Sequence, residues 1–271
     1  MKAPFSRRPQ SPRFALFSDL DGTLIDFHSY QPTDEARAAL RALEAAGVAV
    51  VPVSSKTAAE VAPLMAELGL TGPAVTEGGA VVLGESGRQS LIGPPRAALL
   101  EVLREMQRLA LPVRGMSQMT VEEVCSRTGL TAAAAARAMQ RSGSEPFVAL
   151  GELGTRELEL MRETAGAHGA EIARGGRFWH LLGAGVDKGT AVAALCDSWP
   201  GGRPEATAAV GDAWNDLPML ERVELGFLLG DAVEAAAVPA GVQRIASPGP
   251  QGFVEAVRRL QRAWGLGAAE E

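Results

Sequence analysis

Oxygen-bearing side chains follow two apolar segments of this chain at the points where those segments end. Asp19 and Asp21 come directly after the apolar segment 14–18, and Asp212, Asn215 and Asp216 follow a second apolar segment at 208–210. Carboxylate and amide oxygens are ligands that Mg²⁺ takes in proteins. A carboxylate can also act as a nucleophile or as a general acid-base. Each motif alone could equally be an ordinary Asp-Gly turn or a capped helix start.

Hydroxyl groups and lysines form two further motifs. Ser54-Ser55-Lys56-Thr57 lies between an apolar segment and a predicted helix, and Asp187-Lys188-Gly189 directly precedes another predicted helix. A helix N-terminus with hydroxyls and a cation favours an anion, although plain N-capping needs Thr57 alone. Lysine is scarce here, since only three of the 26 basic residues are lysines. Two of those three lie in these motifs, which favours a functional interpretation.

The four motifs together supply the groups that phosphate-monoester hydrolysis needs. These groups are a nucleophile, an acid-base, cations for the phosphoryl oxygens and ligands for a metal ion. Ligands of open α/β sheets bind where strands end. The sequence therefore predicts that the four motifs meet at one edge of a sheet.

Predicted strands and helices alternate along the parts of the chain that carry these motifs. The patterns predict strands at 14–18, 48–53, 80–83, 208–210, 227–229 and 242–245, and helices at 33–46, 57–68 (kinked at Pro63), 190–198, 216–223 and 251–264. Residues 89–183 break this rhythm. The predicted fold class is α/β, with a doubly wound, mostly parallel, Rossmann-like core sheet and an inserted α+β cap domain. The predicted parts are a disordered extension at 1–13, a core at 14–88 and 184–271, and the cap at 89–183.

Composition excludes several classes of protein. The chain has 271 residues and a formal net charge of −6, which argues against a main role in binding nucleic acid or an anionic membrane surface. It contains no apolar run of about 18 residues, so no membrane-spanning helix is expected. Two cysteines, Cys125 and Cys196, are too few for a disulfide framework and favour reduced thiols in the cytoplasm.

The order and spelling of the motifs resemble the haloacid dehalogenase superfamily of phosphatases, and the position of the insert resembles its subclass IIB. The resemblance implies that Asp19 attacks phosphorus and that Asp21 protonates the leaving oxygen and then activates water. It implies that Ser54 and Lys188 bind phosphoryl oxygens. It also implies Mg²⁺ as cofactor, with Mn²⁺ or Co²⁺ as substitutes, held by Asp19, Asp21, Asp212 and Asp216.

Segments of the predicted cap narrow the resemblance further. The runs 141–147 (RSGSEPF) and 175–181 (GGRFWHL) are similar to runs in the mannosyl-3-phosphoglycerate phosphatases, although the pair Ser142-Gly143 departs from that pattern. This resemblance implies removal of the 3-phosphate to give mannosylglycerate, a compatible solute. A glucosyl substrate and another sugar phosphatase of the subclass remain alternatives. The protein would be a monomer or a homodimer. The implied substrate-binding residues are Thr23, Ser55, Lys56, Glu77, Gly78, Gly79, Arg141, Ser144, Glu145, Arg177, His180 and Asn215.

The substrate of that family carries a phosphate, a carboxylate and sugar hydroxyls. Arg141 or Arg177 could bind the carboxylate as a bidentate fork, and Ser144, Glu145 and His180 could bind hydroxyls. If residues 178–181 form a strand, His180 and Arg177 point to opposite faces. A bend at Arg177 would be needed for both to reach one pocket.

Residues 120–141 suggest a rival class of function. Two short capped helices around Gly129 resemble a helix-turn-helix, as in a DNA-binding sensor of sugar phosphates. The second helix is mostly alanine and offers few side chains that could contact bases. A structural helix pair is therefore the favoured interpretation.

Overall fold

The computed structural model describes residues 13–26, 31–84, 86–175, 177–199 and 201–266. The predicted extension at 1–13 lies outside the described residues except for Arg13. The chain divides into two compact units. The first comprises Met1–Val53, Leu68–Ala74 and Lys188–Glu271, and the second comprises Ser54–Glu67 and Val75–Asp187.

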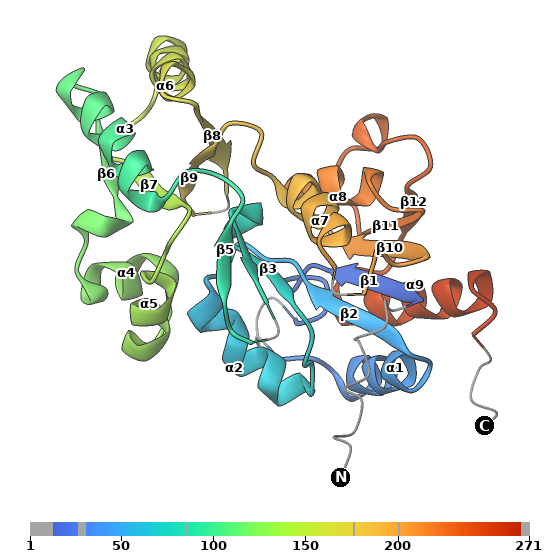
Figure 1. Cartoon of the computed structure of the whole chain (residues 1–271). Helices are drawn as coiled ribbons and strands as arrows, with labels where there is room; N and C mark the ends of the chain where they lie inside the picture. Colours follow the sequence, from blue (N-terminus) through green and yellow to red (C-terminus); the bar gives the residue numbers. More distant parts are fainter. Residues whose placement is uncertain (1–12, 27–30, 85, 176, 200, 267–271) are drawn as a thin grey trace. The chain divides into compact units, whose positions relative to one another are not determined.

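A parallel sheet forms the centre of the first unit (Figure 1). Its strand order is β12-β11-β10-β1-β2, and each neighbouring pair is parallel. The strands are β1 (Phe14–Ser18), β2 (Val48–Pro52), β10 (Ala206–Gly211), β11 (Leu225–Leu229) and β12 (Gln243–Ile245). β1 is fully buried, as expected for an apolar strand covered on both faces. The predicted doubly wound parallel core is confirmed.

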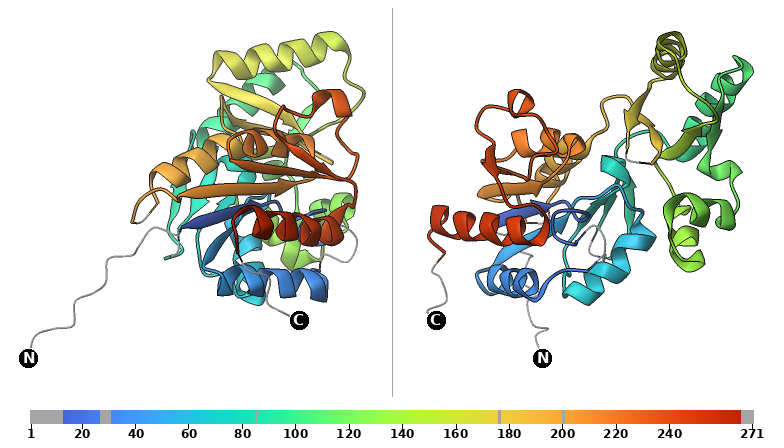
Figure 2. Two further views of the ribbon diagram at one scale, coloured as in Figure 1. Left: turned by 90° about the vertical axis from the view of Figure 1, so that its right-hand side faces the viewer. Right: turned by 180° about the vertical axis from the view of Figure 1, so that it is seen from behind.

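Helices cover both faces of this sheet, α1 and α9 on one and α7 and α8 on the other (Figures 1 and 2). Thr33 caps α1 by accepting a hydrogen bond from the backbone N–H of Ala36, and the stripe Ala36, Leu40 and Leu43 is buried as predicted. The predicted helix at 216–223 is shorter, because a 3₁₀ turn (Trp214–Asp216) precedes α8. The helices are α1 (Asp34–Ala45), α7 (Lys188–Asp197), α8 (Leu217–Glu221) and α9 (Gly249–Ala263).

The strand order places a topological switch point between β1 and β10. From β1 the chain continues to β2 on one side, and it returns later through β10 on the other side. In open α/β sheets, ligands bind at the carboxyl ends of the strands beside such a point. Asp19 directly follows β1 and Asp212 directly follows β10, so both lie at this place.

An antiparallel sheet of order β6-β7-β9-β8 is the main sheet of the second unit. One of its faces packs under α3 and α6, and the other packs against the pair α4 and α5. The strands are β6 (Val113–Gly115), β7 (Glu145–Ala149), β8 (Ala170–Arg174) and β9 (Trp179–Gly183). The helices are α3 (Arg96–Arg108), α4 (Val121–Thr128), α5 (Ala132–Ala138) and α6 (Thr155–Ala167).

The helix pair of residues 120–141 has a structural role in this unit. Gly129 ends α4 in the left-handed conformation, with φ +77. The buried side chains of α4 and α5 pack against Val148 and Phe178 of the neighbouring sheet region. The apolar side of the pair is therefore used for packing, as the favoured interpretation predicts.

A second, smaller sheet and helix α2 (Ala58–Leu68) precede the antiparallel sheet in the chain. This sheet has the order β3-β4-β5, with β3 (Ala74–Thr76), β4 (Val81–Leu83) and β5 (Gln89–Leu91), and a 3₁₀ turn (Glu77–Gly79) joins β3 to β4. The predicted capping box is present, since the N–H of Thr57 donates to Glu60 Oε2 at 2.8 Å and the N–H of Glu60 donates to Thr57 Oγ1 at 3.3 Å. α2 continues through Pro63 as one helix.

The two compact units divide the chain differently from the predicted core and cap. Residues 54–67, 75–88 and 184–187, which the prediction placed in the core, belong to the second unit. Hydrogen bonds explain this. Thr57 Oγ1 lies 2.9 Å from the carbonyl oxygen of Arg137, and Glu77 accepts bonds from residues 142–144. Across the described residues, no helix is both long and apolar enough to traverse a bilayer.

Candidate active site

A lysine and three aspartates meet where β1, β10 and α7 come together in the first unit. Lys188 Nζ lies 2.6 Å from Asp19 Oδ1 and 2.5 Å from Asp216 Oδ1. The backbone N–H of Asp19 donates to the carbonyl oxygen of Val210 at 2.9 Å, which ties the end of β1 to that of β10. Lys188 is 2% exposed, so these ion pairs are shielded from water.

Asp216 fixes the loop that follows β10. Its Oδ2 accepts hydrogen bonds from the backbone N–H groups of Asp212, at 3.0 Å, and Ala213, at 2.9 Å, while its Oδ1 binds Lys188. A Cβ on Gly211 would lie 2.4 Å from Asp216 Cβ, so this close approach requires glycine. Asp216 therefore positions both the lysine and the Asp212 loop.

The loop after β1 holds the side chain of Asp212, whereas Asp216 holds its backbone N–H. Thr23 Oγ1 donates to Asp212 Oδ1 at 3.1 Å. Gly22 has φ +82, and a Cβ there would lie 2.7 Å from Asp212 Oδ2, so glycine is needed for both reasons. Thr23, predicted to bind substrate, is here a partner of Asp212. Asp21 lies in the same turn, half-buried, and forms a bridge with Ile25.

The acidic groups of this cluster are poorly solvated. Burial raises the pKa of Asp19 to about 8, which the Lys188 ammonium opposes and the carboxylates of Asp216 and Asp212 reinforce. Burial and the Asp216 carboxylate likewise raise the pKa of Asp212 to about 6. Burial acts to lower the pKa of Lys188, but the carboxylates of Asp19 and Asp216 outweigh it and raise that pKa.

The cluster has the donor set and charge of a divalent-cation site. One oxygen each from Asp19, Asp212 and Asp216 lies within 4.8 Å of the other two. With all three carboxylates ionised, as metal binding requires, the cluster beside one ammonium would carry a net charge of −2, which a divalent cation would neutralise. Oxygen donors suit Mg²⁺ and Mn²⁺. Three of the four predicted metal ligands therefore come together in this group; the fourth, Asp21, lies in the turn described above.

Metal binding to this cluster should release protons. A carboxyl group with a pKa of about 8 is largely protonated at pH 7, so we expect about one proton to leave per Mg²⁺ bound at that pH. Isothermal titration calorimetry in two buffers of different ionisation enthalpy measures this number. An enthalpy that is independent of the buffer would contradict the expectation.

The same pKa shift makes stability depend on pH. In the folded protein the pKa of Asp19 is about 8, above its ordinary value of 3.8. The protonated carboxyl group therefore contributes its full stabilisation of the fold below about pH 3.8. This stabilisation is lost as pH rises through the higher value. The Tm of the metal-free protein should therefore fall between about pH 5 and pH 8, and added Mg²⁺ should reverse the fall.

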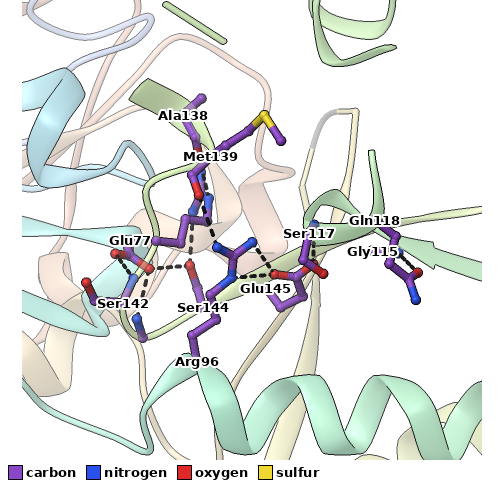
Figure 3. Close-up of polar contacts among 12 residues, drawn as sticks. Glu77, Arg96, Gly115, Ser117, Gln118, Ala138, Met139, Ser142, Ser144 and Glu145 are labelled. Carbon is purple, nitrogen blue, oxygen red and sulfur yellow. Dashed lines mark hydrogen bonds and ion pairs between the residues drawn. The ribbon is translucent and has the colours of Figure 1, made fainter. Parts of the chain in front are cut away.

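In the second unit, a buried network joins Glu77 to the segment 142–144 (Figure 3). Glu77 Oε1 accepts from the N–H of Ser142 at 2.8 Å. Its Oε2 accepts from the N–H of Gly143 at 3.1 Å and from Ser144 Oγ at 2.6 Å. The pair Ser142-Gly143 thus supplies the two backbone donors that hold the Glu77 carboxylate.

Arg141 joins this network through Ser144. Its Nη1 donates to Ser144 Oγ at 3.0 Å and to the carbonyl oxygen of Ser55 at 3.3 Å, and its Nε donates to the carbonyl oxygen of Ala138 at 3.0 Å. These bonds use the Nε hydrogen and both Nη1 hydrogens. Among the residues that the structure describes, Nη2 makes no hydrogen bond. Arg141 therefore offers a ligand this one nitrogen and not the two-nitrogen fork predicted as one possibility.

His180 lies within the electrostatic influence of Arg141. Burial, followed by the Arg141 guanidinium, lowers the pKa of His180 to about 3, so its imidazole is neutral at physiological pH. A Cβ on Gly175 would lie 2.8 Å from His180 Nε2, so the histidine occupies space that glycine leaves open.

Glu145 lies on the opposite face of the antiparallel sheet from His180. Glu145 on β7 is paired with Leu181 on β9, and the Leu181 side chain packs under α3 and α6. His180 directly precedes Leu181, so its side chain lies on the other face. The Glu145 carboxylate binds Arg96 Nε at 2.7 Å and the N–H of Ser117 at 2.8 Å (Figure 3). Arg96 is not among the predicted site residues, and its only signal is the need of a buried glutamate for a cation.

Arg177 is exposed and lies outside the Glu77 network, and it lines a hollow of the second unit together with Arg127 and Arg174. The structure thus places the two arginine candidates for carboxylate binding in different surroundings.

The remaining predicted residues lie in turns. Ser54 Oγ accepts from the N–H of Lys56 at 3.2 Å, and the carbonyl oxygen of Ser54 accepts from the N–H of Gly78 at 2.9 Å. Gly78 and Gly79 have φ of +71 and +111, which explains the glycines. Asn215 is exposed in the 3₁₀ turn before α8.

A family model described as haloacid dehalogenase-like hydrolase matches residues 16–92 and 161–240 of the chain. The chain belongs to the haloacid dehalogenase-like hydrolases. The motif-based expectation of this superfamily is thereby confirmed, and with it hydrolase chemistry of the phosphatase type.

Two curated relatives carry the name glucosyl-3-phosphoglycerate/mannosyl-3-phosphoglycerate phosphatase. The relative from Persephonella marina is 32% identical over 90% of this chain and 96% of its own length. The relative from Methanococcoides burtonii is also 32% identical, over 79% of this chain and 84% of its own length.

Solved structures share the fold of this haloacid dehalogenase-like hydrolase. A protein from Thermoplasma acidophilum superposes with a TM-score of 0.68 at 21% identity, covering 94% of this chain and 99% of that one. A sugar phosphatase of haloacid dehalogenase subclass IIB superposes with a TM-score of 0.68 at 17% identity, covering 94% of this chain and all of that one. At these identities the likeness concerns the fold alone.

Proposed function

We propose that this hydrolase removes the 3-phosphate of mannosyl-3-phosphoglycerate or glucosyl-3-phosphoglycerate and releases the glycosylglycerate and inorganic phosphate. The observation that carries the proposal is the 32% identity, over nine-tenths of the chain, to a relative whose name states both activities. We also propose a reducing, cytoplasmic setting, because a chain with only two cysteines does not rely on a disulfide framework.

In the proposed reaction Asp19 is the nucleophile. Lys188 engages Asp19 Oδ1, so Oδ2 is the oxygen that attacks phosphorus. A bond forms between this oxygen and phosphorus, and the bond from phosphorus to the C3 oxygen of the glycerate breaks. Asp21 donates a proton to the departing oxygen. Asp21 then removes a proton from water, whose oxygen attacks the aspartyl phosphate, and phosphate leaves with Asp19 restored.

The remaining groups of the cluster offset the negative charge of the carboxylates and of the phosphate. Asp19, Asp212 and Asp216 would hold Mg²⁺, whose positive charge would offset that of the carboxylates and of an incoming phosphate. Lys188 supplies a second positive charge beside Asp19, and Asp216 holds this ammonium in place. We assign Ser54 the role of binding the phosphoryl oxygens, as the resemblance implies.

A phosphate-release assay over a panel of sugar phosphates and glycosyl-3-phosphoglycerates tests the proposal. With Mg²⁺, we expect kcat/KM for a glycosyl-3-phosphoglycerate to exceed that for para-nitrophenyl phosphate by at least about a hundredfold, because the larger ester offers more groups to bind. Chelation should abolish both activities. A clear preference for a sugar phosphate without a carboxylate would favour the alternative of another sugar phosphatase, and full activity after chelation would contradict the metal site.

A further inference from the structure

We infer that Glu77 is a positioning residue, which holds Arg141 so that its Nη2 can bind the carboxylate of the substrate. The inference rests on the proposed function, because the carboxylate in question is that of the glycerate.

The backbone at Glu77 is in an unusual conformation. Its φ is +54, in the left-handed region that a residue with a Cβ rarely adopts. Its N–H donates to the carbonyl oxygen of Lys56 at 2.8 Å, so the turn that carries Glu77 is tied to the segment 54–57. Conformations of this kind persist where the surrounding structure enforces them, and they are common at functional sites.

The Glu77 carboxylate sets the direction of the Ser144 hydroxyl. The side chain of Glu77 is buried, with 2% of the residue exposed, and it accepts the hydroxyl proton of Ser144. A serine hydroxyl has one proton to donate. Because that proton points to Glu77, the Ser144 oxygen is left as an acceptor, and Arg141 Nη1 donates to it.

The result is an arginine with one nitrogen left for a ligand. Nε and both Nη1 hydrogens bond to Ala138, Ser55 and Ser144, as described above. Nη2, with its two hydrogens, would bind a carboxylate end-on. The Arg141 charge acts on the neutral imidazole of His180, so the two side chains are close. His180 can therefore donate a further hydrogen bond to the carboxylate as an uncharged group.

Kinetics of Glu77→Gln separate this role from a merely structural one. The amide of glutamine has one acceptor oxygen and one donor nitrogen. Whichever way it turns, its nitrogen faces a donor of residues 142–144, so the network that fixes the Ser144 hydroxyl is weakened. We expect KM for the glycosyl-3-phosphoglycerate to rise about tenfold with little change in kcat. Turnover of para-nitrophenyl phosphate, which has no carboxylate, should stay within about twofold. Equal losses on both substrates, or no loss on either, would overturn the inference.

A double-mutant cycle and a matched control sharpen the test. If Glu77 acts through Arg141, then Glu77→Gln should add little to the loss caused by Arg141→Lys; full additivity would contradict it. Glu123→Gln, which alters a carboxylate of the same unit paired with Arg114, should leave both substrates unaffected.

Inhibition by D-glycerate distinguishes this inference from the proposed function. If the wild type hydrolyses no glycosyl-3-phosphoglycerate, the proposed function fails. If D-glycerate still inhibits para-nitrophenyl phosphate hydrolysis, and Glu77→Gln weakens that inhibition about tenfold, the role of Glu77 stands. Inhibition that Glu77→Gln leaves unchanged, or a wild type that D-glycerate does not inhibit, overturns it.

A second and independent inference concerns the hollow that Arg177 lines. The hollow has a volume of about 460 Å³ and is bordered by Arg127, Arg174 and Arg177, with Glu152 as its carboxylate. Within the ranges that the structure describes, none of the three guanidinium groups has a carboxylate at ion-pair distance. Three like charges around one concave space repel each other, and an anion there would relieve that repulsion.

We propose that this hollow binds a small polyanion, a compound with two or more phosphate groups. The guanidinium of Arg174 lies 4.6 Å from the ring centre of Trp179, which also lines the hollow and holds this arginine over an aromatic surface. Guanidinium groups bind phosphates through paired N–H donors. The volume suits a small ligand.

Titration calorimetry with sodium tripolyphosphate and no divalent cation tests this proposal. We expect the double variant Arg127→Gln/Arg174→Gln to weaken binding at least about tenfold, with turnover of para-nitrophenyl phosphate unchanged. The control Arg104→Gln/Arg108→Gln removes two arginines of α3 that are paired with glutamates, and it should not weaken binding. Wild-type protein that does not bind tripolyphosphate, or equal binding by the first double variant, overturns the proposal.

Discussion

Replacing Asp19 with asparagine should lower kcat by more than about a thousandfold, because an amide oxygen is a poor nucleophile and cannot form the aspartyl phosphate. The expected loss is the same for a glycosyl-3-phosphoglycerate and for para-nitrophenyl phosphate, since both would pass through the same covalent step. Steady-state phosphate release with Mg²⁺ measures it. Residual activity within about tenfold of the wild type would remove Asp19 from the role of nucleophile.

The fold should tolerate this substitution. Asparagine has nearly the same shape as aspartate, and Lys188 keeps its bond to Asp216. Burial disfavours the charged form of Asp19, so above about pH 8 the metal-free variant should be at least as stable as the wild type. The matched control is Asp197→Asn, which changes an exposed aspartate paired with Arg203 and should leave kcat unchanged.

Replacing Lys188 with methionine should remove activity and also destabilise the metal-free protein. The ammonium is the partner of two buried carboxylates, Asp19 and Asp216. Breaking a buried ion pair by removing one partner costs about 3–5 kcal/mol, because the other charge stays buried without compensation. Urea unfolding in the presence of EDTA measures this change in the free energy of unfolding, at a pH above about 8, where Asp19 is charged. Mg²⁺ should restore part of the stability but not the activity.

An exposed ion pair is the natural comparison. Arg203→Met removes the partner of Asp197, and both side chains of that pair are more than half exposed. Exposed pairs contribute about 0–1 kcal/mol, so this variant should unfold close to the wild type. If Lys188→Met were as stable as Arg203→Met, the buried charges would not be coupled in the way the structure indicates.

Much of the core could be predicted because local patterns determine it. The segment 14–18 is an apolar run without a competing helical period, and β1 has the predicted bounds. Thr33 and Thr57 cap their helices as predicted, since an N-cap depends on residues only three apart. The motif residues at the ends of β1 and β10 come together because parallel strands bring their carboxyl ends to one edge.

The second unit was harder to predict because its polar contacts join distant parts of the chain. Glu77 meets Ser144 across 67 positions, and Arg96 meets Glu145 across 49. A single sequence carries no signal for such pairing. Sheet register decides which face a side chain occupies, and it separates Glu145 from His180 although both lie in segments that the resemblance assigned to substrate.

Formation of a covalent phosphoryl intermediate on Asp19 can be tested directly by mass spectrometry. The enzyme is mixed with Mg²⁺ and a glycosyl-3-phosphoglycerate, quenched in acid within one turnover and cleaved with trypsin, and the peptide of residues 14–37 is sequenced. We expect a phosphoryl group on Asp19 that hydroxylamine removes, as for an acyl phosphate. A phosphoryl group on another residue, or an unmodified peptide while product accumulates in a burst, would contradict it.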